Sequence, residues 1–226
     1  MSIKTDKIWF DGEMIRWEDA QVHVLAHALH YGTGYFEGIR CYQVAGGRSA
    51  VFRLPEHMRR LADSGKILGF PLPYTEAQIC QAAIDVIRVN NLRECYVRPL
   101  VFVGLGDLGL YAPNNPVNVC IAAWPWGAYL GDEGLQNGIR AKVSSFTRHH
   151  VNVMMTKSKG TGNYINSVLA KHEVKKAGYD EAIMLDAEGY VSEASGENIF
   201  IVRDRTIKTT PLTSILAFVE TLEDGA

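Results

Sequence analysis

The spacing of apolar residues over the first ninety positions predicts a β-hairpin followed by two helices. Short strands are expected within residues 8–24 around Asp11-Gly12, a dipeptide that reverses antiparallel strands. Pro55 is compatible with a first helical turn, and apolar residues follow it at near-helical spacing until Gly and Pro interrupt them. Thr75 and Gln78 form a capping-box pattern ahead of a second amphipathic segment, which predicts the second helix.

Runs of β-branched and apolar residues in the middle of the chain predict buried strands. The runs are 95–103 and 117–126, and the segment between them is rich in Gly, Pro and Asn, as loops are. A segment at 130–138 resembles a linker. Beyond it the pattern predicts a strand at 139–146, a helix at 164–177 and strands at 182–185, 190–192 and 198–202. This order is typical of an α+β protein, with a small domain over residues 1–129, a linker over 130–138 and a larger domain over 139–226.

Composition places the chain among ordinary folded proteins. Of its 226 residues, 47% are hydrophobic and 21% are charged, without the polar excess of disordered segments. The formal net charge is -2 and the basic residues are scattered, so nucleic acid is not expected as a partner. No apolar run has the length of a signal peptide or of a membrane span, so we expect neither secretion nor membrane insertion.

The four cysteines and seven histidines form no metal-binding pattern. The cysteines are widely spaced, with no CxxC pair and no histidine at ligand spacing. His23, His27 and His30 alternate with small or apolar residues, and His149-His150 lies in a polar bend. The sequence therefore predicts no metal site and a reduced, cytoplasmic protein.

Two lysines are candidates for binding a carbonyl cofactor. A lysine forms a Schiff base only when it is deprotonated for part of the time, which requires surroundings that lower its pKa. Lys157 and Lys159 both precede Gly160-Thr161-Gly162, where backbone can approach a ligand closely, and Asn163-Tyr164 then leads into an apolar helix. Taken alone, the pattern is equally typical of lysines that face solvent.

Candidate groups for the rest of such a cofactor occur elsewhere in the chain. A pyridine ring acts as an electron sink when a carboxylate keeps its nitrogen protonated, and Glu193 and Glu197 flank a turn that can direct one carboxylate inward. A phosphate binds a forked arginine or the N–H groups of a helix start, and Arg59 and Arg60 lie on the first predicted helix. Each pair also fits an ordinary turn or a solvated helix face.

The order of these motifs along the chain resembles the branched-chain amino acid aminotransferases, which are class IV pyridoxal phosphate enzymes of fold type IV. The similarity covers about Ile8 to Leu216, a breadth that makes coincidence negligible. The motifs that carry it are His30-Tyr31-Gly32-Thr33, Phe36-Glu37-Gly38-Ile39-Arg40, His57-Met58-Arg59-Arg60-Leu61, Tyr96-Val97-Arg98-Pro99, Trp126-Gly127-Ala128-Tyr129, Lys159-Gly160-Thr161-Gly162-Asn163-Tyr164, and Ser192-Glu193 with Gly196-Glu197-Asn198.

The resemblance implies roles for individual residues. Lys159 matches the lysine that holds pyridoxal 5'-phosphate and moves the substrate α-proton, which leaves Lys157 without a role. Glu193 matches the carboxylate that pairs with the pyridine nitrogen, and Glu197 matches an outer or exposed position. The other implied groups are Arg60 at the cofactor phosphate, Tyr164 near the cofactor 3-oxygen, and Tyr31, Phe36, Trp126 and Tyr129 in the aromatic wall of the substrate pocket.

The same resemblance implies the substrates. An aromatic wall suits leucine, isoleucine and valine through apolar burial. The amino-group partner in the family is 2-oxoglutarate or glutamate, whose distal carboxylate needs a cation, and Arg98 matches that cation. Tyr96 and Arg98, with Phe36, Gly38 and Arg40, favour this family over relatives that act on D-amino acids or amines. A homo-oligomer, with sites completed by a neighbouring subunit, is also implied.

The resemblance stops after Leu216. There the family has a glycine-isoleucine-threonine turn at a phosphate-binding helix start, whereas this chain has Ala217-Phe218-Val219-Glu220. A later glycine-threonine-alanine turn has no counterpart before Ala226. A truncated or altered product, an incomplete sequence and a natural short homologue each explain this, and an incomplete or altered sequence is favoured. We expect an incomplete large domain, an active complete protein, and an inactive fragment or interaction module if the chain truly ends at Ala226.

Overall fold

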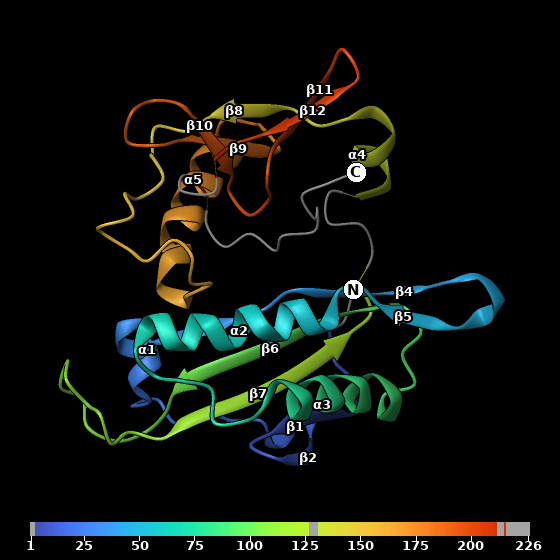
Figure 1. Ribbon diagram of the computed structural model, residues 1–226, viewed down its shortest axis with the longest axis vertical. Helices are drawn as coiled ribbons and strands as arrows, with labels where there is room; N and C mark the ends of the chain where they lie inside the picture. The colour runs from blue at the N-terminus through green and yellow to red at the C-terminus, as the bar shows by residue number, and fades with distance from the viewer. Residues whose placement is uncertain (1–2, 127–130, 212–214, 216–226) are drawn as a thin grey trace. The chain divides into compact units, whose positions relative to one another are not determined.

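The structure, a computed structural model, describes residues 3–126, 131–211 and 215 (Figure 1). Its contacts form two units, Met1–Tyr129 with Gly160–Gly162, and Leu130–Lys159 with Asn163–Ala226. Each unit combines helices with a β-sheet, so the predicted α+β class is confirmed.

The N-terminal hairpin forms where the sequence predicted it. Strands β1 (Lys7–Phe10) and β2 (Glu13–Arg16) pair antiparallel. The φ angles of Asp11 and Gly12 are 46° and 100°, and positive φ at both central residues is what a type I′ turn requires. The expectation of strand structure as far as residue 24 was wrong. Trp17–Asp19 forms a 3-10 turn (η1), which the Arg16 guanidinium closes by donating to the Asp19 carboxylate at 2.8 Å.

A seven-stranded sheet forms the first unit around β6 (Cys95–Val103), a strand that the sequence predicted to the residue. The neighbouring strand β7 ends two residues earlier than predicted, at Trp124. Besides β1 and β2, the other strands of the sheet are β7 (Val117–Trp124), β3 (Gly34–Phe36), β4 (Ile39–Gln43) and β5 (Ser49–Val51). Their order is β2-β1-β7-β6-β4-β5, and β3 also pairs with β6.

Strands β3 and β4 pair with the same edge of β6 and are separated by Glu37-Gly38. The register places this break opposite Arg98-Pro99. Proline has no N–H group, so a continuous partner strand would lack a ladder hydrogen bond here. The Glu37 N–H still donates to the Pro99 carbonyl at 2.9 Å. The break therefore fixes the backbone of Glu37, whose side chain is fully buried.

The two predicted helices are α2 (Leu54–Leu68) and α3 (Glu76–Val89). The capping box is confirmed, because Gln78 N–H donates to Thr75 Oγ1 at 3.3 Å and Thr75 N–H donates to Gln78 Oε1 at 2.9 Å. Figure 1 shows both helices lying across one face of the sheet, with the main hydrophobic core between. Fully buried members of this core include Tyr35, Ile39, Met58, Leu61, Ile79, Val86, Val97, Val101 and Ile121.

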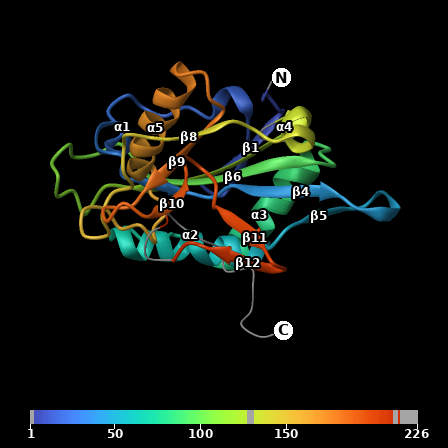
Figure 2. The ribbon, with the colours of Figure 1, turned by 90° about the horizontal axis from the view of Figure 1, so that it is seen from above.

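Several short elements of the first unit were not predicted. Helix α1 (His27–Tyr31) and strands β3, β4 and β5 each contain five residues or fewer, which is too short to show a hydrophobic period. A 3-10 turn, η2 (Ala45–Gly47), joins β4 to β5. The hairpin of these two strands extends from the edge of the sheet (Figure 2).

A three-stranded sheet with one packed helix forms the second unit. Strand β9 (Glu181–Leu185) pairs in parallel with β8 (Ala141–Val143) and antiparallel with β10 (Val191–Ala194). Helix α5 (Tyr164–Lys176) packs on β9 through a small core of Ala170, Val174, Ala182 and Met184. A separate exposed hairpin, β11 (Phe200–Arg203) with β12 (Thr206–Thr209), follows, and β12 was not predicted.

Residues 130–138, which resembled a linker, contain a short helix, α4 (Gly131–Asn137). Its N–H···O=C bonds include one from Gly138 to Gly134 at 3.1 Å. Gly and Asp in this segment favoured an irregular structure, so the helix was not foreseen.

Strand β10 contains an irregularity that affects Glu193. Its pairing with β9 shifts register between Val191 and Glu193, which marks a β-bulge. In a regular strand successive side chains face opposite sides, whereas Ser192, Glu193 and Ala194 are all buried here. The bulge thus allows Glu193 to point inward next to a second buried side chain.

Among the described residues, no helix is long and apolar enough to cross a membrane.

Candidate active site

Lys159 and Tyr164 lie at the N-terminal end of α5 in the second unit. Lys159 Nζ donates to Tyr164 Oη at 2.8 Å and lies 5.4 Å from the centre of its ring. Both side chains are half-buried, whereas Lys157 is exposed. The buried Asn163 amide donates to the Ser158 carbonyl at 3.0 Å, which closes the turn that carries the lysine. The structure thus distinguishes Lys159 from its neighbour on burial and contacts.

The turn after Lys159 is held by hydrogen bonds within the first unit. Thr161 Oγ1 donates to the Gly32 carbonyl at 2.8 Å, and Gly160 forms an isolated bridge with Tyr35. Gly32 has a φ of +66°, and a Cβ atom there would lie 3.0 Å from Gly162 Cα. Glycine is therefore required at Gly32 both by its left-handed backbone and by this close approach.

Glu193 is buried against an arginine that the sequence did not indicate. Arg148 Nε lies 2.8 Å from Glu193 Oε1, and only 2% and 5% of the two side chains are exposed. Arg148 also donates to Ser167 Oγ and to the Ala194 carbonyl, both at 3.0 Å. Burial lowers the pKa of Arg148, and the nearby Glu193 carboxylate and Tyr164 hydroxyl oppose this shift. Arg148 therefore supplies the positive charge that an ionised, buried Glu193 needs.

Arginines are usually exposed, so position 148 carried no signal for this role in the sequence. Its only hint was a predicted buried strand shortly before it. The ion pair joins residues 148 and 193 and depends on the bulge in β10, which periodicity does not reveal.

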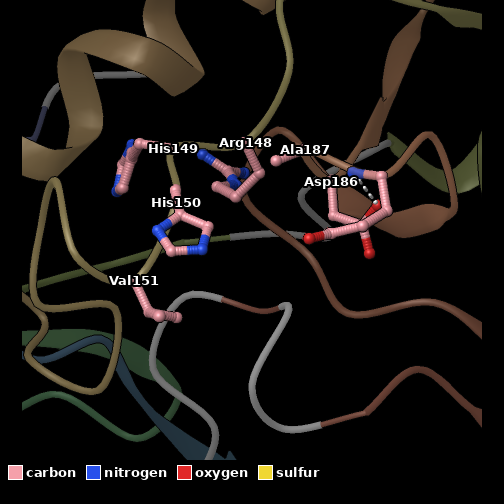
Figure 3. A pocket seen from close by; sticks show the side chains of 7 residues that line it. Arg148, His149, His150, Val151, Asp186 and Ala187 are labelled. Atoms are coloured by element: carbon pink, nitrogen blue, oxygen red, sulfur yellow. Dashed lines mark hydrogen bonds between the residues drawn. The ribbon is translucent and has the colours of Figure 1, made fainter.

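A small open pocket of about 140 Å³ lies beside Arg148, lined also by His149, His150, Asp186 and Glu188 (Figure 3). The His150 ring accepts a hydrogen bond from Asn152 N–H at 3.2 Å. Burial and the charge of Arg148 lower the pKa of His149. Within the described part of the chain, no three His, Cys, Asp or Glu side chains are grouped to hold a metal ion.

Arg60 and Glu37 form a forked ion pair in the first unit. Arg60 Nε and Nη2 donate to the two Glu37 oxygens at 2.5 and 2.6 Å, and His57 Nδ1 lies 2.7 Å from Oε2. Arg60 is half-buried, while its neighbour Arg59 is exposed and 3.9 Å from Glu76. The structure thus holds Arg60 in one orientation, as an anion-binding arginine requires.

An aromatic cluster surrounds Arg98 in the same unit. The Arg98 guanidinium lies 4.4 Å from the Phe36 ring centre, and its Nη2 donates to Tyr96 Oη at 2.9 Å. The Tyr96 ring lies 5.5 Å from that of Trp126 and 5.2 Å from that of Trp124, a residue not singled out from sequence. Phe36, Tyr96, Arg98 and Trp126 are therefore brought together.

Two further residues implied for the substrate pocket are not part of the described cluster. Tyr31 donates to the Leu108 carbonyl at 2.5 Å and packs against His27 at 4.6 Å between ring centres. Tyr129 lies outside the described residues.

Glu197, expected at an outer or exposed position, is partly buried. Burial and the nearby Glu181 carboxylate raise the pKa of Glu197. Glu181 itself pairs with Lys171 and the Ser195 hydroxyl, which lower its pKa against the effect of burial.

Comparisons with known proteins assign the family. A family model for amino-transferase class IV matches residues 34–217. The branched-chain-amino-acid aminotransferase of Pseudomonas aeruginosa is 51% identical over 216 residues, which are 96% of this chain and 70% of that protein. The crystal structure of the Escherichia coli branched-chain amino acid aminotransferase has a TM-score of 0.92 at 51% identity, covering 95% of this chain and 70% of that one.

A third similar protein, from the source abbreviated T.th., was solved with a ligand. This branched-chain amino acid aminotransferase, complexed with N-(5'-phosphopyridoxyl)-L-glutamate, has a TM-score of 0.88 at 45% identity, covering 95% of this chain and 70% of that one. The chain thus spans about 70% of the length of these relatives, as expected for an incomplete large domain.

The family model covers most of the chain, and the relatives are about half identical across nearly all of it. These findings confirm the resemblance that the sequence motifs indicated. The chain belongs to the class IV aminotransferases, a family of enzymes whose solved branched-chain members share its fold.

Proposed function

We propose that the chain is a pyridoxal phosphate-dependent transaminase that exchanges an amino group between branched-chain L-amino acids and 2-oxoglutarate. The observation that carries this proposal is the half-buried Lys159 amine, 2.8 Å from Tyr164 Oη, in a protein 51% identical to a branched-chain-amino-acid aminotransferase.

The donor groups fit pyridoxal phosphate in kind. Lys159 offers an amine for the cofactor aldehyde, and Glu193 offers a buried carboxylate for the ring nitrogen. Arg60 offers a forked cation for the phosphate, and Tyr164 a hydroxyl for the 3-oxygen. When bound, the cofactor supplies an electron-withdrawing ring that acidifies the α-proton of the amino acid.

The residues of the chain move and stabilise charge around that chemistry. Lys159 Nζ takes the α-proton from one face of the substrate and returns it to the reacting framework. Tyr164 orients the amine through its hydrogen bond. Glu193, kept ionised by Arg148, stabilises a protonated ring nitrogen.

The aromatic residues and Arg98 suit two kinds of substrate. Phe36, Trp126 and, by resemblance, Tyr31 and Tyr129 provide an apolar wall for aliphatic side chains. Arg98 provides a cation for the distal carboxylate of glutamate, and the glutamate adduct in the T.th. relative supports glutamate as the second substrate. Expected effects of Arg98→Ala are a large rise in KM for 2-oxoglutarate and a small one for branched-chain amino acids.

Reductive fixation and a substrate panel test the proposal. Borohydride treatment after addition of pyridoxal phosphate is expected to attach the cofactor to Lys159, as shown by peptide mass spectrometry. The matched control Lys157→Ala retains attachment, whereas Lys159→Ala abolishes it. Attachment elsewhere, or none on folded protein, sinks the cofactor assignment. Turnover of D-amino acids or simple amines in preference to leucine, isoleucine and valine sinks the substrate assignment.

The remaining expectations are part of the same proposal. We place a small domain at residues 1–129 and a larger one from 139 onward, with 130–138 between them. The four cysteines are free thiols, which suits a reducing, cytoplasmic location. A homo-oligomer follows from the family, and light scattering of the purified protein measures it.

A further inference from the structure

Glu37 is the most completely buried carboxylate near the residues implied for cofactor binding. Its side chain has no solvent exposure, and it follows β3 where the strand breaks opposite Pro99. A buried carboxylate is strongly unfavourable unless cations and N–H groups surround it. The family motif contains this residue, but the proposed reaction gives it no role.

The partners of Glu37 come from a single turn of α2. Arg60 Nε and Nη2 donate to Oε1 and Oε2 at 2.5 and 2.6 Å, which is the parallel, two-bond geometry of an arginine fork. His57, one turn earlier, places Nδ1 2.7 Å from Oε2. Arg60 and His57 expose only 14% and 13% of their side chains, so the group is largely shielded from water.

This arrangement restricts an otherwise flexible side chain. An arginine loses much rotamer entropy when a ligand immobilises it, and that loss weakens binding. The fork with Glu37 fixes both the position and the plane of the guanidinium before any anion arrives. Because the guanidinium is planar, fixing one edge also fixes the direction of the opposite edge.

We propose that Glu37 is a positioning residue that holds the Arg60 guanidinium in the orientation in which it binds the cofactor phosphate. The inference rests on the proposed function, since it concerns the phosphate group of the same cofactor. His57 completes the set by donating to the Glu37 oxygen that Arg60 Nη2 also contacts.

Electrostatics alone makes the opposite prediction. Glu37 is negative and close to Arg60, so removal of its charge leaves the arginine more attractive to a phosphate dianion. Positioning predicts weaker phosphate binding after Glu37→Gln, and simple charge neutralisation predicts tighter binding. The sign of the change therefore separates the two effects.

The experiment compares pyridoxal phosphate with pyridoxal, which lacks the phosphate, by fluorescence titration of the whole protein. Glu37→Gln keeps the size of the side chain but presents an amide N–H to one arm of the fork. We expect roughly threefold to tenfold weaker binding of pyridoxal phosphate and an unchanged affinity for pyridoxal. The matched control is Glu56→Gln, which removes a carboxylate on the same helix that pairs with Arg53 at 2.7 Å, and it should bind both compounds as the wild type does.

A second variant covers the case in which Glu37→Gln does not fold. Arg60→Lys keeps the positive charge but cannot form the fork, and it should lose the preference for the phosphorylated compound to a similar extent. Equal or tighter binding of pyridoxal phosphate by folded Glu37→Gln, or wild-type affinity in Arg60→Lys, overturns the inference and leaves the proposed function intact. A wild-type protein that binds pyridoxal and pyridoxal phosphate equally overturns both.

Discussion

Lys159 Nζ and Tyr164 Oη are joined by a hydrogen bond of 2.8 Å, and the five-residue step between them runs through a glycine-containing turn into α5. The tyrosine is the first residue of that helix, so the start of the helix fixes one end of the pair. The buried Asn163 amide fixes the turn itself. The orientation of the lysine therefore depends on how α5 begins.

Removal of the Tyr164 hydroxyl is expected to reduce transamination without unfolding the protein. Tyr164→Phe keeps the ring and loses the hydrogen bond to Lys159, and kcat/KM should fall by about tenfold, which corresponds to about 1.4 kcal/mol. Steady-state kinetics with leucine measures it. Tyr190→Phe, at a tyrosine that is 73% exposed, is the control and should not change the rate. Unchanged kinetics in Tyr164→Phe means that the hydroxyl does not orient the amine.

Loss of Arg148 is expected to destabilise the second unit. Arg148→Met leaves Glu193 buried without its cation, and breaking one member of such a pair costs about 3–5 kcal/mol. Urea denaturation measures the free energy of unfolding. The double variant Arg148→Met with Glu193→Gln should recover part of the loss, because neither side chain then carries an unpaired charge.

A surface arginine provides the comparison for that experiment. Arg140 is 75% exposed and lies 4.0 Å from Asp180, so Arg140→Met should change stability by less than about 1 kcal/mol. Equal effects of the two arginine substitutions contradict a structural role for the buried pair.

Acid should destabilise the protein partly through Glu173. The Ser144 hydroxyl and the Ser145 N–H donate to this carboxylate at 2.6 and 2.9 Å and lower its pKa from 4.5 to about 2. Since the folded state favours the ionised form, this stabilisation is present above pH 4.5 and is lost as the pH falls towards about 2.

Glu173→Gln should therefore lose less stability than the wild type over that interval. Urea midpoints measured at several pH values test this. Glu188→Gln, at an exposed glutamate of the same unit, should follow the wild-type curve. Parallel curves for wild type and Glu173→Gln show that the serine contacts do not matter.

Gly65 in α2 is expected to tolerate no side chain. A Cβ atom there would lie 2.4 Å from Tyr35 Oη, and Tyr35 is fully buried with its hydroxyl bonded to the Phe70 carbonyl. Glycine to alanine in a helix ordinarily stabilises by about 0.5–1 kcal/mol, but Gly65→Ala should destabilise by about 1–3 kcal/mol. Thermal unfolding measures the change, with the exposed Lys66→Ala as control. A melting temperature at or above the wild-type value rules out the clash.

The elements predicted correctly are those with a strong local signal. Residues 95–103 alternate between buried and partly buried positions along most of β6, and Thr75 with Gln78 makes a cap that needs no distant partner. Strands β3, β4 and β5 are short and are held by pairing with β6 or with each other. Such pairing is not encoded in a local period, so these strands were missed.

The candidate site divides in a similar way. Lys159, Glu193 and Arg60 were found because they belong to recognisable motifs, and the structure adds the partners that hold them. Arg148 and Glu37 are buried charges that act through residues 45 and 23 positions away, respectively. Sequence position alone gives no measure of burial for a charged side chain, so these supporting residues required the structure.

The bulge in β10 makes the position of Glu193 depend on the length of the strand as well as on its composition. Deleting a residue such as Ser192 from a regular strand turns every later side chain to the other face. Here the extra residue is what lets a serine and a glutamate face inward in succession. A protein engineer who grafts this carboxylate onto another hairpin must therefore copy the irregular spacing together with the glutamate, because the correct residue in a regular strand would face away from its arginine.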